Sequence, residues 1–546
     1  MRRLASICLL AAGLALPAVA GGMPATAAEQ VPAKPVGFAG QLAAGQRQVH
    51  PLPLPAGQVA RGRLVGAGVR LFLLDALGRP VRRLSAGLYD SDEFMFLAGD
   101  AGPYALAVQA DAGGAYRLEV ERLVPRASPP AAPGGEPESP RLRALATGAS
   151  LAGFWDEVAR SGAPLVERHG VVPPLGENEY LVTFLWRGAE HNVRLLGAPS
   201  GEHDELFRLG QTDVWYRSYR LPADTRLTYR MAPDVPALDA PPAMRRRAIV
   251  ATLRRDPLNP RSHPAQPVDA YDGDSLLELP QAPAQAWVER SPGVAAGMLT
   301  AHRLSSALLG NARTVHLYRS PGYRAGRPGN ALVVLFDGEI HAGTASTADI
   351  LDNLVAAGRL PPTAAILIGN PDRDARSGEL PPNPSFARFL AEELMPWARA
   401  AGVCAEPART VIGGASYGGL AAAWAGLTHP ELFGRVYSQS GSFWWSPKDE
   451  REPEWLSRRF AAEPAVPVAF LLEAGLFESN GRGIGILEGT RHLRDVLRAK
   501  GYRVAYREHA AGHDWYHWRG RLGEGLLELL GDDAAGDASS ERASCP

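Results

Sequence analysis

The 546-residue sequence contains few cysteines. Only Cys8, Cys404 and Cys545 are present, which excludes a disulfide-rich scaffold and a cysteine-rich metal site. Cys8 lies in an N-terminal export segment described below, so at most one disulfide is possible after its removal. We expect Cys404, which precedes a strand, to be a small buried apolar side chain rather than a nucleophile.

The sequence also lacks an excess of charge of either sign. Its 57 Lys and Arg residues are balanced by 58 Asp and Glu residues, for a formal net charge of −1. Nucleic-acid binding normally shows as a strong basic excess, so the charge gives no reason to expect a nucleic-acid partner. With 46% hydrophobic residues the chain can bury a large core, and its length predicts about three domains.

Long apolar runs are missing beyond the N-terminus. No later stretch approaches the roughly 18 apolar residues that a membrane helix needs, so we predict no membrane span. At the N-terminus, Arg2 and Arg3 precede an apolar run from Leu4 to Val19 that is followed by small residues. This pattern predicts a secretory signal peptide over residues 1–28, the alternative being a retained helix. An exported protein with so few cysteines suits a periplasmic or secreted enzyme that is stabilised by its core.

Short alternating strands predict a β-sandwich module over residues 36–122. Examples are residues 104–108 and 116–120, which place apolar side chains on one face. Residues 123–141 form a predicted linker, with six prolines in the sixteen residues from Pro125 to Pro140. Because nothing in the module looks catalytic, we expect it to be dispensable for chemistry.

The rest of the chain divides into a second β-rich domain, a connector and an α/β domain. The predicted bounds are 150–260, 261–295 and 296–531, with a disordered tail over 532–546. Residues 331–336 and 364–368 are continuous apolar runs, typical of strands buried on both faces of a parallel sheet. They alternate with helical stretches such as 384–401 and 486–500, which predicts a mostly parallel sheet covered by helices on both faces.

The segment Gly414-Ala-Ser416-Tyr-Gly418 follows the apolar run Thr410-Val-Ile412 and precedes a helix of small residues. This strand–turn–helix context is that of the nucleophile elbow of α/β hydrolases, in which flanking glycines permit a very tight turn. We therefore predict an α/β hydrolase fold, preceded by two β-sandwich-like domains, with Ser416 as the nucleophile.

The base and the acid of a triad should follow in the order Ser, acid, His. His513 comes after the last predicted strand and after the small bend Ala511-Gly512, and we prefer it to His509 and His517. Glu478 and Glu473 compete for the role of the acid. We prefer Glu478, which lies beyond the turn at Gly475, but Glu473 or a Ser–His dyad remain possible alternatives.

An oxyanion hole needs two backbone N–H groups aimed at the developing negative charge. One should belong to Tyr417, the residue after the nucleophile. The other should come from the loop after the strand that ends at Phe336, and we favour the N–H of Glu339.

Residues 150–531 resemble the enterochelin esterases, siderophore hydrolases of the esterase-D-like branch of α/β hydrolases. The motifs that carry the resemblance include Gly414-Ala-Ser-Tyr-Gly-Gly-Leu420, Ser438-Gln-Ser-Gly-Ser-Phe-Trp-Trp445, Gly512-His-Asp-Trp-Tyr-His-Trp-Arg519 and Val182-Thr-Phe-Leu-Trp-Arg187. The N-terminal module is similar, through its closing Tyr-x-Leu-x-Val strand, to pre-peptidase C-terminal-like domains. The signal peptide and this module depart from the shorter, cytoplasmic members of the family.

The resemblance implies hydrolysis of the ester bonds of ferric enterochelin, a trilactone with a triply negative iron centre. No metal or organic cofactor of the protein is expected, because the iron belongs to the substrate. Such a substrate calls for cations and aromatic faces, which suggests contacts from Arg376, Arg519, Trp445 and Trp518. Arg376 could instead form a structural pair with Glu379. The alternatives are a feruloyl-type carboxylesterase acting on another aromatic ester, and a protein that binds siderophores without hydrolysis.

Overall fold

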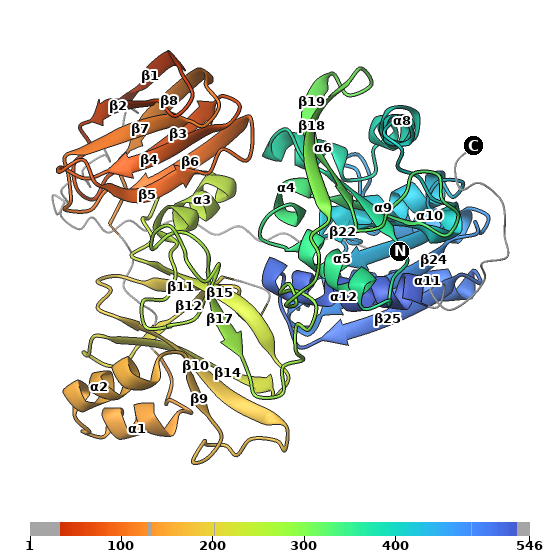
Figure 1. Cartoon of the computed structure of the whole chain (residues 1–546). Helices are drawn as coiled ribbons and strands as arrows, with labels where there is room; N and C mark the ends of the chain where they lie inside the picture. Colours follow the sequence, from red (N-terminus) through yellow and green to blue (C-terminus); the bar gives the residue numbers. More distant parts are fainter. Residues whose placement is uncertain (1–32, 128–133, 201–202, 482, 532–546) are drawn as a thin grey trace, which may run out of the picture.

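The computed structural model describes residues 33–127, 134–200, 203–481 and 483–531. The predicted signal peptide and the predicted C-terminal tail therefore lie outside the described residues. In chain order the described part forms a β-sandwich, a second β-rich domain and an α/β domain (Figure 1). The predicted fold class is confirmed. Among the described residues, no helix combines the length and the apolar character required to cross a bilayer.

The N-terminal module consists of two four-stranded antiparallel sheets that pack face to face. Their inward side chains, among them Leu64, Leu71, Phe96 and Leu118, form one apolar core. One sheet has the strand order β1 (Ala33–Leu42), β8 (Gly114–Leu123), β3 (Val59–Val65) and β6 (Ser91–Leu97). The other has the order β2 (Arg47–Leu52), β7 (Tyr104–Ala110), β4 (Val69–Leu74) and β5 (Pro80–Ser85).

The second domain also contains two sheets. The first has the order β13 (Phe207–Arg208), β14 (Val214–Pro222), β10 (Glu179–Arg187) and β9 (Leu165–Glu167). The second has the order β12 (Asp204–Glu205), β11 (Val193–Leu196), β15 (Arg226–Pro233), β17 (Asp274–Glu278) and β16 (Ser262–His263). Its helices are α1 (Pro140–Ala146), α2 (Leu151–Ser161) and α3 (Pro242–Thr252).

The connector predicted over residues 261–295 is partly wrong, because β16 and β17 belong to the second domain's sheet. Strand β17 pairs antiparallel with β15, Leu277 lying opposite Leu227. The surrounding prolines hid these strands at the sequence level, since proline removes a ladder hydrogen bond and is usually a sign of a loop or an edge.

The α/β domain contains an eight-stranded sheet. The six strands from β21 to β25 in the order below are parallel to one another. At the edge beside β21, the hairpin of β18 and β19 joins the sheet, with β19 antiparallel to β21. The order is β18 (Met298–Ser306), β19 (Asn311–Arg319), β21 (Thr363–Ile368), β20 (Ala331–Phe336), β22 (Thr410–Ala415), β23 (Arg435–Gln439), β24 (Ala469–Gly475) and β25 (Arg503–His509). Separate apolar clusters cover the two faces of the sheet, as the continuous apolar strands predict.

Helices surround this sheet (Figure 1). Residues 384–400 are continuous but change character, with a π-helical segment, Phe389–Leu394, between two α-helices. The helices are α4 (Gly338–His341), α5 (Thr347–Ala356), α6 (Arg373–Glu379), α7 (Pro384–Arg388), α8 (Met395–Ala400), α9 (Tyr417–Thr428), α10 (Trp455–Ala462), α11 (Ile486–Ala499) and α12 (Trp515–Leu530).

The N-terminal module packs against both of the other domains and is not connected to them by the linker alone. The backbone N–H of Asp90 donates to the carbonyl of Pro371 at 3.0 Å, and Arg63 pairs with Asp374 at 3.2 Å. On the second domain, Arg83 pairs with Asp272 at 2.7 Å. These contacts lie far apart in the sequence, so a pattern of local strands could not reveal them.

Candidate active site

Ser416 occupies the sharp turn between β22 and α9. Its backbone has φ 59° and ψ −120°, a strained conformation for a residue with a side chain. The flanking glycines permit this turn, because a Cβ on Gly414 would lie 3.0 Å from the backbone of Gly418, and one on Gly418 would lie 3.3 Å from Phe336. The serine hydroxyl is half-buried and lies 3.4 Å from the hydroxyl of Ser442. The local geometry is that of a nucleophile elbow.

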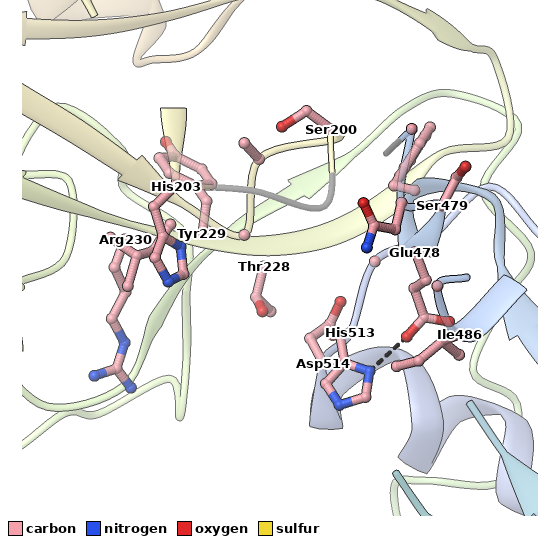
Figure 2. A pocket seen from close by; sticks show the side chains of 18 of the residues that line it. Ser200, His203, Thr228, Tyr229, Arg230, Glu478, Ser479, Ile486, His513 and Asp514 are labelled. Carbon is pink, nitrogen blue, oxygen red and sulfur yellow. Dashed lines mark hydrogen bonds and ion pairs between the residues drawn. The ribbon is translucent and has the colours of Figure 1, made fainter. Parts of the chain in front are cut away.

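Glu478 holds His513 from the loop after β24. Its Oε1 lies 2.5 Å from Nδ1 of His513 (dashed in Figure 2). Its Oε2 accepts hydrogen bonds from the backbone N–H of Gly475 at 2.6 Å and from the hydroxyl of Ser440 at 2.7 Å. The Glu478 side chain is only 2% exposed, against 40% for His513. The carboxylate is therefore fixed, and the imidazole's other nitrogen is left toward the solvent-accessible space.

Neither competing histidine contacts Glu478. His509 lies 3.3 Å from Glu473, and burial lowers the pKa of His517 to about 3, which keeps its imidazole neutral. Of the three histidines considered from the sequence, His513 alone is exposed and paired with Glu478.

Glu473, the competing acid, points into the sheet. It accepts a hydrogen bond from the Tyr437 hydroxyl at 2.7 Å and lies 3.2 Å from Arg521. Burial alone raises the pKa of Glu473, but hydrogen bonds and the charges of His509 and Arg521 outweigh burial and lower it to about 2. Glu473 is a structural anion beside the site, as its place at the strand end predicts.

The loop after β20 is held by a buried ion pair. Asp337 directly follows β20 with a positive φ of 58°, and Arg376 on α6 donates to both of its carboxylate oxygens, at 2.6 and 2.7 Å. Asn370 adds a hydrogen bond to Asp337 at 2.8 Å. These contacts fix the backbone of Gly338 and Glu339. The N–H of Glu339 is one of the two predicted oxyanion donors. The other, the N–H of Tyr417, belongs to the first residue of α9, where N–H groups lack intrahelical partners.

A cleft of about 770 Å³ lies between the second domain and the α/β domain. Figure 2 shows His203, Tyr229 and Arg230 of the second domain across from Glu478 and His513. Trp444, which is 38% exposed, and Phe477 add aromatic surface to the lining. The cleft matches the prediction that the second domain packs near the hydrolase site.

The four predicted substrate contacts, Arg376, Arg519, Trp445 and Trp518, are not among the residues that line this cleft, and neither is Ser416. Trp445 packs edge-on against Trp455, and Arg519 stacks on Tyr516 with its charged carbon 4.5 Å from the ring centre. Trp518 is buried, packs edge-on against His513 with ring centres 4.6 Å apart and donates to Ser440 at 3.0 Å. None of the three lines the cleft.

The alternative pair between Arg376 and Glu379 is not formed. Glu379 pairs with the buried Arg313 at 2.8 Å and accepts from Asn311 at 2.6 Å. Arg376 is committed to Asp337 instead, because α6 directs residues 376 and 379 to different neighbours.

Sequence reasoning missed Ser440, although it lies in the motif from Ser438 to Trp445. Ser440 has a positive φ of 50°, which aims its hydroxyl at Glu478. An isolated serine gives no sequence signal for this role.

A serine in a nucleophile elbow, a histidine paired with a buried carboxylate and a mostly parallel sheet are features of the α/β hydrolase fold. The Esterase family model matches residues 305–529, and the model for the N-terminal domain of enterochelin esterases matches residues 181–288. The chain is a carboxylic ester hydrolase, and it belongs to the enterochelin (enterobactin) esterase family.

Relatives with named activities match 70% of the chain. An iron(III) enterobactin esterase of Dickeya dadantii is 33% identical over 420 residues, which span 70% of this chain and 93% of the relative. An iron(III) salmochelin esterase of Escherichia coli is 31% identical over 406 residues, spanning 70% and 94%. The crystal structure of the Shigella flexneri enterobactin esterase in the presence of enterobactin shares 28% identity and a TM-score of 0.55, covering 70% of this chain and 98% of its own.

Proposed function

We propose that the protein hydrolyses the ester bonds of a ferric catecholate siderophore of the enterobactin type, with Ser416, His513 and Glu478 as its triad. The observation that carries this proposal is the hydrogen bond from His513 to a buried glutamate at a cleft between two domains. The names of the relatives supply the substrate class, because they act on iron(III) enterobactin and iron(III) salmochelin.

In the acylation step, the hydroxyl oxygen of Ser416 attacks the ester carbonyl while Nε2 of His513 takes its proton. Ser416 and His513 are not hydrogen-bonded to each other in the described structure, and such contacts often tighten only when substrate binds. Glu478 accepts from Nδ1–H, which fixes the tautomer and stabilises the imidazolium. The N–H groups of Tyr417 and Glu339 stabilise the tetrahedral oxyanion.

His513 then donates its proton to the departing alcohol, and an acyl-enzyme ester remains on Ser416. Water, deprotonated by the same imidazole, attacks this ester, and the imidazole returns the proton to the oxygen of Ser416 as the carboxylic acid is released. Iron takes no part in these steps, since it travels with the substrate as cargo.

Export to the periplasm is the second part of the proposal. Its support is the charged and apolar pattern of residues 1–28 and the disulfide-bonded state of Cys404, since disulfides persist in oxidising compartments. Fractionation of cells that express the full chain should place the mature protein in the periplasm, with its N-terminus shortened by about 28 residues. Retention of Met1 in the cytoplasm would refute this part.

Hydrolysis is tested by mass spectrometry of the products from ferric enterobactin, from its linear fragments and from a feruloyl ester. We expect linear products from the trilactone, and Ser416→Ala should lose activity by about 10⁶-fold. Faster turnover of the feruloyl ester would support the alternative esterase. Binding of the siderophore with no product from the wild-type protein would support the non-hydrolytic alternative.

A further inference from the structure

Helix α3 lies where two cavities meet. Its Arg246 lines the catalytic cleft together with His513 and Glu478, and it also lines an adjacent cavity of about 1160 Å³. His203 likewise lines both cavities. A charge on α3 therefore faces the space through which a large substrate reaches the triad.

The charge of Arg246 is not neutralised by the carboxylates of the adjacent cavity. The adjacent cavity is lined by two carboxylates, and each has an arginine: Glu205 pairs with Arg194 at 3.7 Å, and Asp239 pairs with Arg126.

In contrast, Arg246 is exposed and forms no ion pair with any residue that the structure describes, and the same holds for Arg245 beside it. In the catalytic cleft, Arg230 is already paired with Asp274 at 2.5 Å. Arg246 is therefore the arginine of the catalytic cleft that remains available to an anionic ligand.

The N-terminal module holds this helix in place. In Figure 1, α3 lies directly beneath β5 and β6 of the module. Ala251 of α3 is buried in an apolar cluster with Val59 and Met95 of the module. On the same helix, Arg247 pairs with Glu93 of β6 at 2.5 Å. Arg247 is thus bound to the module, while its neighbour Arg246 is directed to the cavities.

Arg82 of the module stabilises the C-terminal end of α3. Its guanidinium donates to the carbonyls of Ala251 at 2.6 Å and of Val250 at 3.3 Å. Carbonyls in the last turn of a helix have no intrahelical partner, and a cation there complements the helix dipole. The other end has no side-chain cap at Pro241. Among the described residues, the side-chain hydrogen bonds that cap an end of α3 therefore come from Arg82 of the module.

We propose that Arg246 is a specificity-determining residue for an anionic substrate, and that the N-terminal module is the scaffold that positions it. This inference rests on the proposed function, since a ferric tris-catecholate is a large anion whose delocalised oxygens suit a guanidinium. The two family models match only residues between 181 and 529. The module lies before these residues, so the models assign no role to it.

Binding is measured in the Ser416→Ala background, where turnover does not interfere. Quenching of tryptophan fluorescence by ferric enterobactin gives Kd. Arg246→Gln should raise Kd about tenfold at low salt, the size of effect expected for a hydrogen bond to a charged group. The difference should shrink at about 0.5 M salt, because salt screens exposed charges.

The matched control is Arg503→Gln on β25. Arg503 is also exposed, forms no ion pair with the described residues and borders a different cavity, so its Kd should stay within twofold of the parent. An Arg246→Gln variant that is equally unaffected would overturn the inference. Because the measurement is of binding to an inactive variant, its outcome is separate from that of the hydrolysis assay, which tests the proposed function.

In active enzyme, the ratio of kcat/KM for ferric enterobactin to kcat/KM for neutral p-nitrophenyl butyrate should also fall about tenfold in Arg246→Gln. An unchanged ratio would contradict a role in charge recognition.

The scaffold role is tested by a double-mutant cycle of Arg82→Gln and Arg246→Gln. If Arg82 acts through Arg246, Arg82→Gln raises Kd for ferric enterobactin in the single variant but adds little once Arg246 is gone. Glu93→Gln, at a partly exposed ion pair, provides a second cycle with less risk to folding. Fully additive effects in both cycles would refute the scaffold role.

Discussion

Replacing Glu478 by Gln changes one atom at the centre of the site. The amide oxygen can still accept from Gly475 or Ser440, which lie 2.6 and 2.7 Å from the present Oε2. The amide nitrogen, however, would then face Nδ1 of His513, 2.5 Å from the present oxygen. Two donors cannot share this contact, so the imidazole adopts the other tautomer and cannot accept the proton of Ser416 at Nε2.

The expected loss in kcat is about 10⁴-fold, the effect of the equivalent change in a serine protease, which corresponds to roughly 5 kcal/mol in the activation barrier. The burst phase of a p-nitrophenyl ester, measured by stopped flow, reports acylation directly. Unfolding curves establish that equal amounts of folded protein are compared.

Glu473→Gln is the matched control, because it makes the same chemical change in another buried glutamate of the same strand–loop segment. Glu473 contacts Tyr437 and Arg521 but not His513, so acylation per folded molecule should change by less than about tenfold. A larger loss from Glu473→Gln than from Glu478→Gln would transfer the acid role to Glu473. Small losses from both would indicate a Ser–His dyad.

Three further predictions concern charges around the site. The pKa of Glu473 is lowered to about 2 from 4.5, so its ionised carboxylate stabilises the fold by roughly 3 kcal/mol. This stabilisation is present above about pH 4.5 and is lost as the pH falls toward 2. The Tm deficit of Glu473→Gln should therefore shrink in acid, and a constant deficit would contradict this. Burial raises the pKa of Asp514 to about 7 from 3.8, so its charged form destabilises the fold as the pH rises through 7. Asp514→Asn, which can still cap α12, should raise Tm at pH 8 but not at pH 4. A lower Tm of this variant at pH 8 would contradict the prediction. Arg376→Lys, which loses the two-pronged contact with Asp337, should lower kcat up to about 100-fold through the oxyanion loop; a higher KM for ferric enterobactin at unchanged kcat would instead make Arg376 a substrate contact.

The order of the domains and the position of the nucleophile are encoded locally. Continuous apolar runs such as residues 331–336 are typical of strands buried on both faces, and Gly414 and Gly418 mark a turn in which a Cβ would crowd neighbouring atoms. The choice of His513 also followed from local features, since it stands after the last strand beside a small-residue bend. Each of these signals lies within a few residues of the feature that it predicts.

The partners of the charged side chains depended on tertiary structure. Glu473 and Glu478 are five positions apart, and only the pairing of β24 with β23 and β25 turns the first into the sheet and leaves the second beside His513. In the same way, Arg376 meets Asp337 rather than Glu379 because α6 packs against the loop after β20.

The docking of the N-terminal module was likewise decided by the tertiary structure. Arg82 donates to the carbonyl of Ala251 at the end of α3, and the two residues are 169 positions apart in the sequence. No local sequence pattern predicts such a contact. Secondary structure reflects the preferences of neighbouring residues, and the sequence by itself determined that much, together with the tight turn that carries Ser416. The pairing of charged side chains depends on the directions of side chains from elements that come together only when the chain folds. For this reason only the tertiary structure showed the contact between Glu478 and His513, the cleft between the domains and the docking of the module.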